Sequence, residues 1–325
     1  MSRVVVAGGA GFIGAALCRR LVERGDQVAC VDNLVTGRES NLEGLAGHPG
    51  FDLVRADICS GVDVAGPVDS VINLACPASP ADFGPLGLEI LEVGSTGTRV
   101  LLELAEAKGA RLLHASTSEV YGDPLVHPQP ETYLGNVNPI GPRSVYDESK
   151  RFAETLVMAH HRRRGTDVRI ARIFNTYGPR MRADDGRVVS NLVTQALAGA
   201  PLTLYGDGRQ TRSLCYVEDL VTGIVGILEC DHVGPVNLGT TDERSVVELA
   251  QLVKELTGSA SPVVHLPALA DDPAQRRPDL SLAEALIGWS PATGLREGLA
   301  RTIEWFAGAG MPGPKMSRGG QAGAG

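Results

Sequence analysis

The segment VVVAGGAGFIG (residues 4–14) decides the fold of this chain. Residues 3–7 are a β-branched run, which is typical of a buried strand. The glycine-rich turn GGAGFIG at 8–14 follows at once and leads into an amphipathic stretch over 15–24, which predicts a helix that Gly25 ends. A strand, a glycine turn and a helix in this order predict the first half of a dinucleotide-binding βαβ unit.

A second apolar run over 27–31 ends at Asp32 and completes that unit. Gly8 allows the tight turn, Gly11 lets the backbone approach a pyrophosphate, and Gly14 lets helix and strand pack closely. The helix N-terminus offers its free N–H groups to the same anion. Asp32 is placed to accept hydrogen bonds from the adenosine ribose, and its charge would repel a 2′-phosphate. The sequence therefore predicts NAD, rather than NADP, as the cofactor.

Strands and helices continue to alternate after this unit. Further strands are expected at 51–56, 70–74, 111–115 and 168–173, and long helices at 86–108 and 145–163. Such alternation predicts an α/β fold with a doubly wound parallel Rossmann-type sheet, in which ligands bind beyond the carboxyl ends of the strands. The polar clusters of the chain follow these strand ends, so we expect them to form one site.

The pattern loosens after Pro179 into shorter helices and strands, which predicts a smaller mixed α/β C-terminal substrate lobe. We assign residues 1–178, with about 213–235, to the NAD-binding Rossmann domain, and 179–212 and 236–307 to the substrate lobe. The Gly- and Pro-rich residues 308–325 have little to bury, and we expect a disordered tail.

The composition excludes several classes of protein. A net charge of −8 without a basic block argues against a nucleic-acid partner. The 6 cysteines are scattered, form no CxxC, and lie at no metal-ligand spacing with histidine, so we expect reduced thiols, no metal and a cytoplasmic location. No signal peptide precedes the first strand and no apolar run reaches membrane-spanning length, so no membrane partner is expected.

Tyr146 and Lys150 are the candidate catalytic pair. They are four residues apart, so a helix over 145–163 places both side chains on one face. An ammonium one turn away favours the phenolate, and lowering the tyrosine pKa by roughly 3 units corresponds to about 4 kcal/mol. Such a phenolate can take a proton from a sugar hydroxyl. A Tyr-x-x-x-Lys spacing is common, and it gains meaning from the cluster at 116–119 that ends the strand at 111–115.

These motifs resemble the extended short-chain dehydrogenase/reductase superfamily of nucleotide-sugar enzymes, over about residues 4–306. Within it the chain is similar to the UDP-glucuronate decarboxylase family, on the segments CPASP (76–80), ASTSEVYGDP (115–124), NPIGPRSVYDESKR (138–151), ARIFNTYGPRM (171–181), DGRVVSN (185–191) and DDPAQRRPD (271–279). The resemblance implies NAD-dependent decarboxylation of UDP-glucuronate through a 4-keto intermediate, giving UDP-xylose, UDP-4-keto-pentose or both. It also implies a homodimer paired through helices 86–108 and 146–163.

The resemblance further implies roles for individual residues. Tyr146 is the base for the C4 hydroxyl, and Lys150 tunes it and holds the nicotinamide ribose. Thr117 contacts the C4 oxygen or Tyr146, while Ser118 and Glu119 handle the sugar ring and its carboxylate. Arg276 meets the carboxylate or supplies a proton; a salt bridge that closes the lobes, or a contact with the UDP phosphates, is the structural alternative.

Ligand contacts follow from the same resemblance. The cofactor-binding residues are expected to be Gly8, Gly11, Phe12, Ile13, Asp32, Asn33, Thr36, Gly37, Asp57, Ile58, Leu74, Ala75, Ser116, Tyr146, Lys150 and Arg180. The substrate-binding residues are expected to be Pro77, Glu119, Asn175, Val189, Ser190, Asn191, Tyr205, Gln210, Arg212 and Arg276.

Two alternatives remain open at this stage. One is a UDP- or dTDP-sugar 4-epimerase or 4,6-dehydratase on the same fold; in the related dehydratases the residue after the threonine is an aspartic acid, and Ser118 is a poor acid. The other is a non-catalytic NAD sensor, which the intact Tyr146, Lys150 and Thr117 argue against. The chain also departs from the family at Gly94, where asparagine is common, and at Ser149, where glycine is common; the second change is harmless if Ser149 faces outward.

Overall fold

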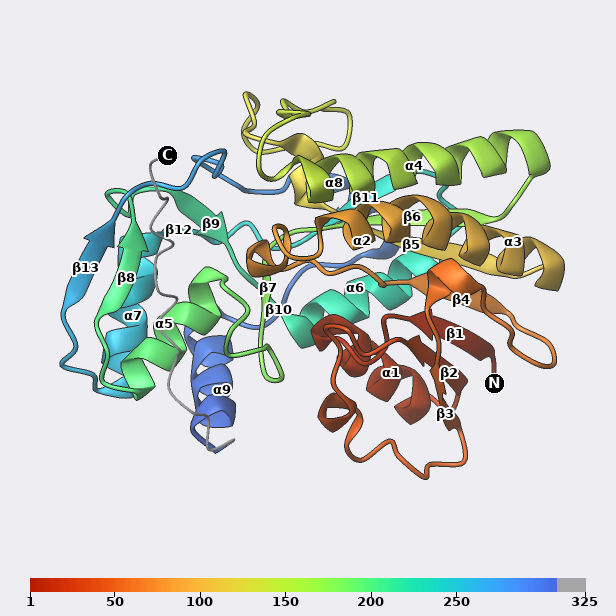
Figure 1. Ribbon diagram of the computed structural model, residues 1–325, viewed down its shortest axis with the longest axis horizontal. Coiled ribbons are helices and arrows are strands. Elements are labelled where there is room, and N and C mark those ends of the chain that lie inside the picture. Colours follow the sequence, from red (N-terminus) through yellow and green to blue (C-terminus); the bar gives the residue numbers. More distant parts are fainter. Residues whose placement is uncertain (309–325) are drawn as a thin grey trace, which may run out of the picture.

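The computed structural model describes residues 1–308, and the rest of the predicted tail lies outside the described residues. A seven-stranded parallel sheet forms the centre, in the order β11-β6-β5-β4-β1-β2-β3 (Figure 1). Its strands are β1 Arg3–Ala7, β2 Gln27–Asp32, β3 Phe51–Arg55, β4 Ser70–Asn73, β5 Arg111–Thr117, β6 Val168–Ile173 and β11 Pro235–Leu238. This Rossmann-like sheet confirms the predicted fold class.

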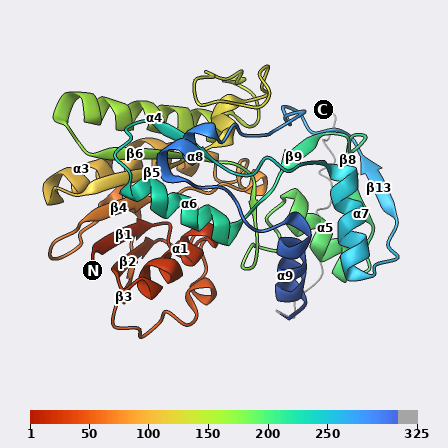
Figure 2. The ribbon, with the colours of Figure 1, turned by 180° about the vertical axis from the view of Figure 1, so that it is seen from behind.

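Helices cover both faces of the sheet (Figures 1 and 2). One face carries α1 Phe12–Glu23, α6 Val217–Glu229 and α8 Ser281–Ile287; the other carries α2 Gly87–Glu92, α3 Thr98–Lys108 and α4 Ser144–Arg164. Side chains alternate between the two layers because successive residues of a strand point to opposite faces. Val4 and Val6 of β1 pack on the α1 side, whereas Val5 and Ala7 pack on the α3 side. The uninterrupted apolar run at 4–7 is explained by this burial on both faces.

The helix predicted over 86–108 is interrupted by a π-helical turn, Val93–Gly97, between α2 and α3. Two glycines in the turn allow close packing. A Cβ at Gly97 would lie 2.6 Å from Ile58 Cδ1, and one at Gly94 would lie 2.8 Å from Ser149 Cβ. Helix α1 also begins earlier than predicted, at Phe12, so its first turn lies inside the glycine motif.

The C-terminal half contains a smaller mixed α/β lobe with its own core (Figure 1). Its elements are α5 Val188–Leu197, β8 Leu202–Tyr205, β9 Thr211–Ser213, β12 Glu243–Ser245, α7 Val246–Thr257, β13 Val263–Leu266 and α9 Leu295–Gly308. Short strands β7 Thr176–Tyr177 and β10 Cys215–Tyr216 pair in parallel where the chain passes between the two parts. Leu204 of β8, Leu249 of α7 and Phe306 of α9 meet in the core of the lobe.

The predicted boundary at residue 236 does not hold, because strand β11 belongs to the main sheet. Val236 pairs with Ala171 of β6, and α8 packs against β11 and α6. The Trp289 indole N–H donates to the Asp219 carbonyl of α6 at 3.0 Å. The four-residue strand was assigned to the wrong part because its partner, β6, lies more than 60 residues away in sequence.

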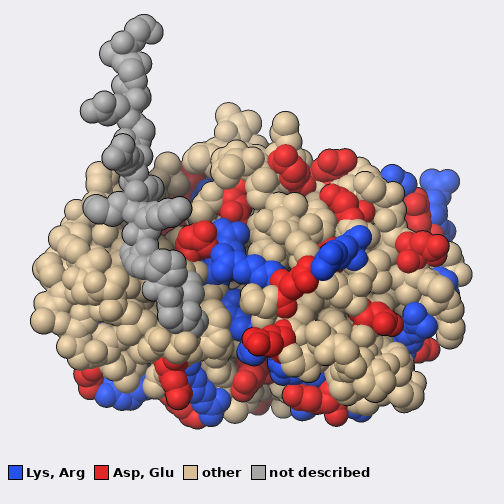
Figure 3. Space-filling view, turned by 60° about the horizontal axis from the view of Figure 1, so that its bottom comes forward, with Lys and Arg blue, Asp and Glu red and all other residues tan. Residues whose placement is uncertain are grey.

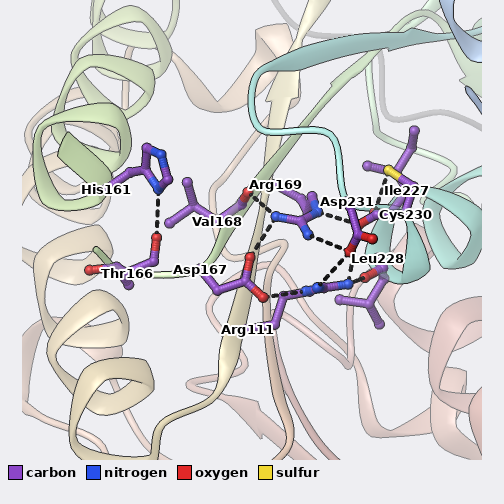
Figure 4. A network of polar contacts seen from close by, with 10 residues as sticks. All are labelled: Arg111, His161, Thr166, Asp167, Val168, Arg169, Ile227, Leu228, Cys230 and Asp231. Atoms are coloured by element: carbon purple, nitrogen blue, oxygen red, sulfur yellow. Dashed lines mark hydrogen bonds and ion pairs between the residues drawn. The ribbon is translucent and has the colours of Figure 1, made fainter. Parts of the chain in front are cut away.

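The half-buried Arg111 and the buried Arg169 tie the amino ends of two neighbouring strands to the end of helix α6 (Figure 4). Arg111 of β5 and Arg169 of β6 each donate to the Asp167 carboxylate, at 2.7 and 2.6 Å. Both also donate to the Cys230 carbonyl after α6 and lie within 3.6 Å of Asp231. The network satisfies polar groups at the end of the sheet opposite the carboxyl ends of the strands, and we assign it a structural role.

No helix within residues 1–308 is long and apolar enough to cross a bilayer.

Candidate active site

The glycine turn after β1 forms a cradle that a side chain would fill. Gly8 has a φ of +78°, and a Cβ there would lie 2.7 Å from the Ala75 nitrogen. A Cβ at Gly14 would clash with the Gly8 carbonyl. Gly11 is the N-cap of helix α1 and offers no side chain to its first N–H groups, and the first turn holds no acid. Gly8, Gly11, Phe12 and Ile13 line one cavity. This donor set fits the pyrophosphate of a dinucleotide.

Asp32 has a structural task that the sequence analysis did not foresee. Its Oδ2 accepts from the Ala10 N–H at 2.9 Å and its Oδ1 from the Leu34 N–H at 2.8 Å, so it fixes the glycine turn. Burial raises the pKa of Asp32, and these two N–H groups oppose the rise. Gly37 packs against the carboxylate, because a Cβ there would lie 2.7 Å from Oδ1. Neither Asp32 nor Gly37 lines the main cavity.

Other predicted cofactor contacts divide into two groups. Asn33 and Asp57 join the ends of β2 and β3, since the Asn33 amide donates to Asp57 Oδ2 at 3.1 Å. These two residues, Ile58 and Ala75 lie beside the cavity without lining it. The predicted cofactor residues that do line it are Gly8, Gly11, Phe12, Ile13, Thr36, Leu74, Ser116, Tyr146, Lys150 and Arg180.

Helix α4 presents Tyr146 and Lys150 to this cavity, as the four-residue spacing predicts. Both are buried, with 7% and 5% of their surface exposed. Lys150 Nζ donates to the Ala115 carbonyl at 2.9 Å and lies 5.9 Å from the centre of the Tyr146 ring. Burial in the protein raises the pKa of Tyr146, Cys76 adds to the rise, and the Thr117 hydroxyl opposes it. The lowering that positive charge beside the ring would cause stays a prediction.

Arg276, Glu119 and Arg143 form a buried charge cluster at the end of β5. Arg276 lies in the segment after β13 and is 1% exposed. It contacts both Glu119 oxygens, at 3.1 and 3.3 Å, and donates to Ser118 Oγ at 2.8 Å and to the Gly122 carbonyl at 2.8 Å. Arg143 Nη2 donates to Glu119 Oε2 at 2.9 Å. Burial alone would raise the pKa of Glu119, but Arg276 and Arg143 lower it to about 2, so Glu119 is ionised at neutral pH.

Asp147 completes this cluster, although the sequence analysis did not select it. It follows Tyr146 on α4, is 6% exposed, and its Oδ1 has no hydrogen-bond partner among residues 1–308. Burial and the nearby Glu119 raise the pKa of Asp147 to about 7, while Arg143 and Arg276 oppose the rise. The cluster therefore contains one acid that stays ionised and one that exchanges a proton near neutral pH.

Only some of the predicted substrate-binding residues line the cavity. Those that line the cavity are Glu119, Asn175, Asn191, Tyr205, Gln210, Arg212 and Arg276. Val189 and Ser190 do not line the cavity: Val189 lies in the core of the smaller lobe, and Ser190 is buried with its hydroxyl bonded to the Arg187 carbonyl. Pro77 is buried and does not line the cavity. Arg212 is bound to Asp272 at 2.8 Å, so its guanidinium is already paired.

Several cavity-lining residues were missed. Arg143 could have been found from its position three residues before Tyr146 at the start of the same helix. Phe83, Asp82, Arg182 and Arg187 carry no recognisable spacing, since the loop after β4 and the segment before α5 meet only in the folded chain.

The two departures from the family lie against each other. Ser149 is 3% exposed and does not face outward, contrary to the condition set in the sequence analysis. Its Cβ and carbonyl would lie 2.8 and 2.9 Å from a Cβ at position 94, and its hydroxyl donates to the Tyr146 carbonyl at 2.8 Å. Gly94 thus leaves room for Ser149 on the helix that carries Tyr146 and Lys150.

Arginine side chains converge on the cavity from both parts of the chain. Those that line it are Arg143, Arg180, Arg182, Arg187, Arg212 and Arg276. Figure 3 shows Lys and Arg gathered near the middle of one face, with Asp and Glu beside them. Arg180 has a φ of +71° and no hydrogen bond or ion pair to the described residues. A cavity of this kind suits an anionic ligand that carries several charges.

A Rossmann-like sheet, a glycine cradle and a buried Tyr–Lys pair define a dinucleotide-dependent enzyme of the short-chain type. Residues 4–239 match the model of the NAD dependent epimerase/dehydratase family, and the chain belongs to that family. It is an enzyme, and its cofactor is NAD.

Several proteins with similar sequences are decarboxylases. The chain is 53% identical to UDP-glucuronic acid decarboxylase 1 of Arabidopsis thaliana over 304 residues, which cover 94% of this chain and 69% of the relative. It is 49% identical to UDP-glucuronic acid decarboxylase 1 of Danio rerio over 305 residues, which cover 94% of this chain and 72% of the relative.

Solved structures of similar shape include two epimerases. UDP-glucuronic acid 4-epimerase from Bacillus cereus, in complex with UDP-glucuronic acid and NAD, is 27% identical with a TM-score of 0.85, and the match covers 94% of this chain and 99% of that one. UDP-glucose 4-epimerase from Thermotoga maritima, with UDP-glucose, is 29% identical with a TM-score of 0.86 and the same two coverages.

Proposed function

We propose that this enzyme decarboxylates UDP-glucuronate through a 4-keto intermediate and releases UDP-xylose, UDP-4-keto-pentose or both. The observation that carries the proposal is the hydrogen bond between Arg276 and Ser118, 2.8 Å long, in the cavity that Tyr146 also lines. A serine cannot protonate a leaving hydroxyl as a carboxylic acid does, and a buried guanidinium favours a carboxylate-bearing sugar. Decarboxylase relatives at about half identity support the same reading.

Bound NAD would supply one piece of chemistry, the removal of hydride from C4 and, where UDP-xylose is the product, its return. Tyr146 takes the proton of the C4 hydroxyl and gives it back at the end, which requires its phenolate. Because burial in the protein raises the Tyr146 pKa, a positive charge beside the ring must offset that burial. Lys150, bonded to the Ala115 carbonyl, supplies one such charge and positions the ribose of the cofactor.

A ketone at C4 makes the carboxylate at C5 a β-keto acid. The C5–C6 electron pair then delocalises into the ketone, carbon dioxide leaves, and C5 takes up one proton. We assign Arg276 and Ser118 to the sugar carboxylate and Glu119 to holding Arg276 in place. Arg180, Asn191, Gln210 and Arg212 line the cavity and are assigned to ligand contacts, with Arg180 on the cofactor side.

A 4-epimerase acting on the same sugar is the second candidate, since the B. cereus 4-epimerase shares the fold at 27% identity. The two reactions give different masses. Decarboxylation removes carbon dioxide from UDP-glucuronate, whereas epimerisation leaves the mass unchanged.

The test is incubation with UDP-glucuronate, with and without added NAD, followed by mass spectrometry of the nucleotide sugars. We expect a product lighter by carbon dioxide, and its hydrogen count separates UDP-xylose from the 4-keto sugar. The Tyr146→Phe variant is the matched control. An isomeric uronate without gas release would establish the epimerase instead, and no conversion of any UDP-sugar would favour a sensor.

We also propose a homodimer paired through α2, α3 and α4. Leu88 of α2 is 80% exposed and Phe152 of α4 is 52% exposed, and the two helices pack together. A second copy would cover this apolar face. Light scattering should give twice the chain mass, and Phe152→Glu should give a monomer.

The cytoplasmic location stays a prediction, which the six free cysteines support. Cell fractionation tests it.

A further inference from the structure

The Phe83 ring is stacked on the ring of Tyr146. The two ring centres are 5.1 Å apart and the planes differ by 16°. Phe83 is 7% exposed and lines the cavity, and the Arg143 guanidinium lies over its ring at 5.6 Å. With Ile90 of α2, the two rings form a small apolar cluster separate from the main cores. Phe83 is therefore part of the wall that keeps water from the Tyr146 side chain.

Asp82, the residue before Phe83, is bonded to Arg182 of the smaller lobe. Both terminal nitrogens of Arg182 bond the two oxygens of Asp82, each at 3.1 Å, and the two side chains are 19% and 11% exposed. A forked pair of this kind fixes distance and orientation together, which a lysine cannot reproduce.

Further hydrogen bonds join the same two segments. Arg187 donates to the Ala78 carbonyl at 2.6 Å, and the Ser79 hydroxyl donates to the Asp185 carbonyl. Residues 182–187 lead directly into α5, whose buried residues belong to the core of the smaller lobe. The loop after β4 is thus bound along its length by the lobe on the other side of the cavity.

We propose that Phe83 is a positioning residue for Tyr146, and that the Asp82–Arg182 pair clamps Phe83 in place from the smaller lobe. The orientation of the phenol then depends on the two parts of the chain being joined at this point. The proposal depends on the function proposed above only because it treats Tyr146 as catalytic. The contacts of Phe83, Asp82 and Arg182 do not depend on that function.

Two variants at position 83 test the stacking. Phe83→Leu removes the aromatic ring and keeps an apolar side chain, and we expect kcat to fall roughly tenfold to a hundredfold while KM changes by less than about threefold. Because the smaller side chain admits water and burial raises the Tyr146 pKa, the acidic limb of the kcat–pH profile should move to lower pH. Phe83→Tyr keeps the stacked ring and should restore both values.

The clamp is tested by Arg182→Lys, which keeps the charge and loses the fork. We expect a smaller loss of kcat than for Phe83→Leu. The double variant should be no worse than Phe83→Leu alone, because the clamp acts through Phe83. Additive losses, or an effect confined to KM, would show that Arg182 acts on the substrate and would overturn the clamp.

A measurement without turnover separates this inference from the proposed function. The protein is labelled with 3-fluorotyrosine, which replaces 6 tyrosines, and the Tyr146 resonance is assigned with Tyr146→Phe. Ring current from Phe83 should shift that ¹⁹F resonance, and Phe83→Leu and Arg182→Lys should both move it. An unchanged resonance in both variants rejects the inference whatever the substrate. A moved resonance in an enzyme that does not decarboxylate UDP-glucuronate rejects the proposed function alone.

Discussion

Arg276 donates a hydrogen bond of 2.8 Å to Ser118 Oγ while it is paired with Glu119 at 3.1 Å. The two residues lie 158 positions apart in sequence, so the contact is made only by the fold. Arg276 also donates to the Gly122 carbonyl and is 1% exposed, so it both closes the end of β5 and faces the cavity.

Arg276→Lys should lower decarboxylation at least tenfold, because one ammonium cannot reach Ser118, Glu119 and Gly122 together. Release of carbon dioxide and formation of NADH are followed in the same sample. Loss of carbon dioxide release with NADH formation intact would assign Arg276 to the carboxylate. Unchanged release would contradict the assigned role, and the thermal midpoint of unfolding serves as the folding control.

Tyr146→Phe should lower turnover by roughly 10³-fold, since general-base catalysis contributes on the order of 10²–10⁴. NAD binding, measured by calorimetry, should stay within about threefold, because the glycine cradle and Lys150 are untouched. Turnover within tenfold of the unsubstituted enzyme would remove Tyr146 from the mechanism. Tyr133→Phe is the matched control, since its ring lies beside Tyr121 and Phe174 and away from Tyr146.

Asp147→Asn should stabilise the protein at pH 8 and leave it nearly unchanged near pH 4. The folded-state pKa of about 7 lies above the ordinary value of 3.8, so the folded state holds the proton more tightly and stability is lost as pH rises through about 7. The gain at pH 8 should be on the order of 2 kcal/mol. Urea unfolding at the two pH values measures it, and a variant equally stable or less stable at pH 8 refutes this account of Asp147.

Gly94→Ala should destabilise the protein by about 1–3 kcal/mol, because the new Cβ would lie 2.8 Å from Ser149 Cβ. Adding Ser149→Gly removes that Cβ and should recover part of the loss. Gly294→Ala is the control, since no atom of the described residues lies within 4 Å of a Cβ there. Thermal unfolding measures all four proteins, and equal midpoints for Gly94→Ala and Gly294→Ala would mean that the helices are not packed as described.

Local patterns were sufficient for the cofactor half of the fold. The glycines at 8, 11 and 14 have no side chains and a helix follows them, so their task can be deduced from spacing alone. Strand β11 was misassigned because a strand of four residues does not reveal its partner. The burial of the Val189 and Ser190 side chains could not be predicted for a related reason: which face of α5 is buried depends on the core of the smaller lobe.

The charge state of the site could not be deduced from residue types. A lysine four residues after a tyrosine predicts a lowered tyrosine pKa, yet burial raises that of Tyr146. Glu119 and Asp147 are both carboxylic acids, but two guanidiniums lower the pKa of Glu119 to about 2. Burial and the neighbouring Glu119 carboxylate raise the pKa of Asp147 to about 7. These pKa differences arise from burial and from charged groups that only the fold brings close to each residue.

The sequence by itself determined the Rossmann-type sheet, the NAD turn and the Tyr146–Lys150 pair, because each depends on residues that are near one another in the chain. The tertiary structure alone decided that Arg276 meets Ser118 and that Arg182 holds the loop bearing Phe83. Those contacts join segments 100 or more residues apart. Their geometry depends on how two separately packed cores are joined, and no local spacing encodes that arrangement.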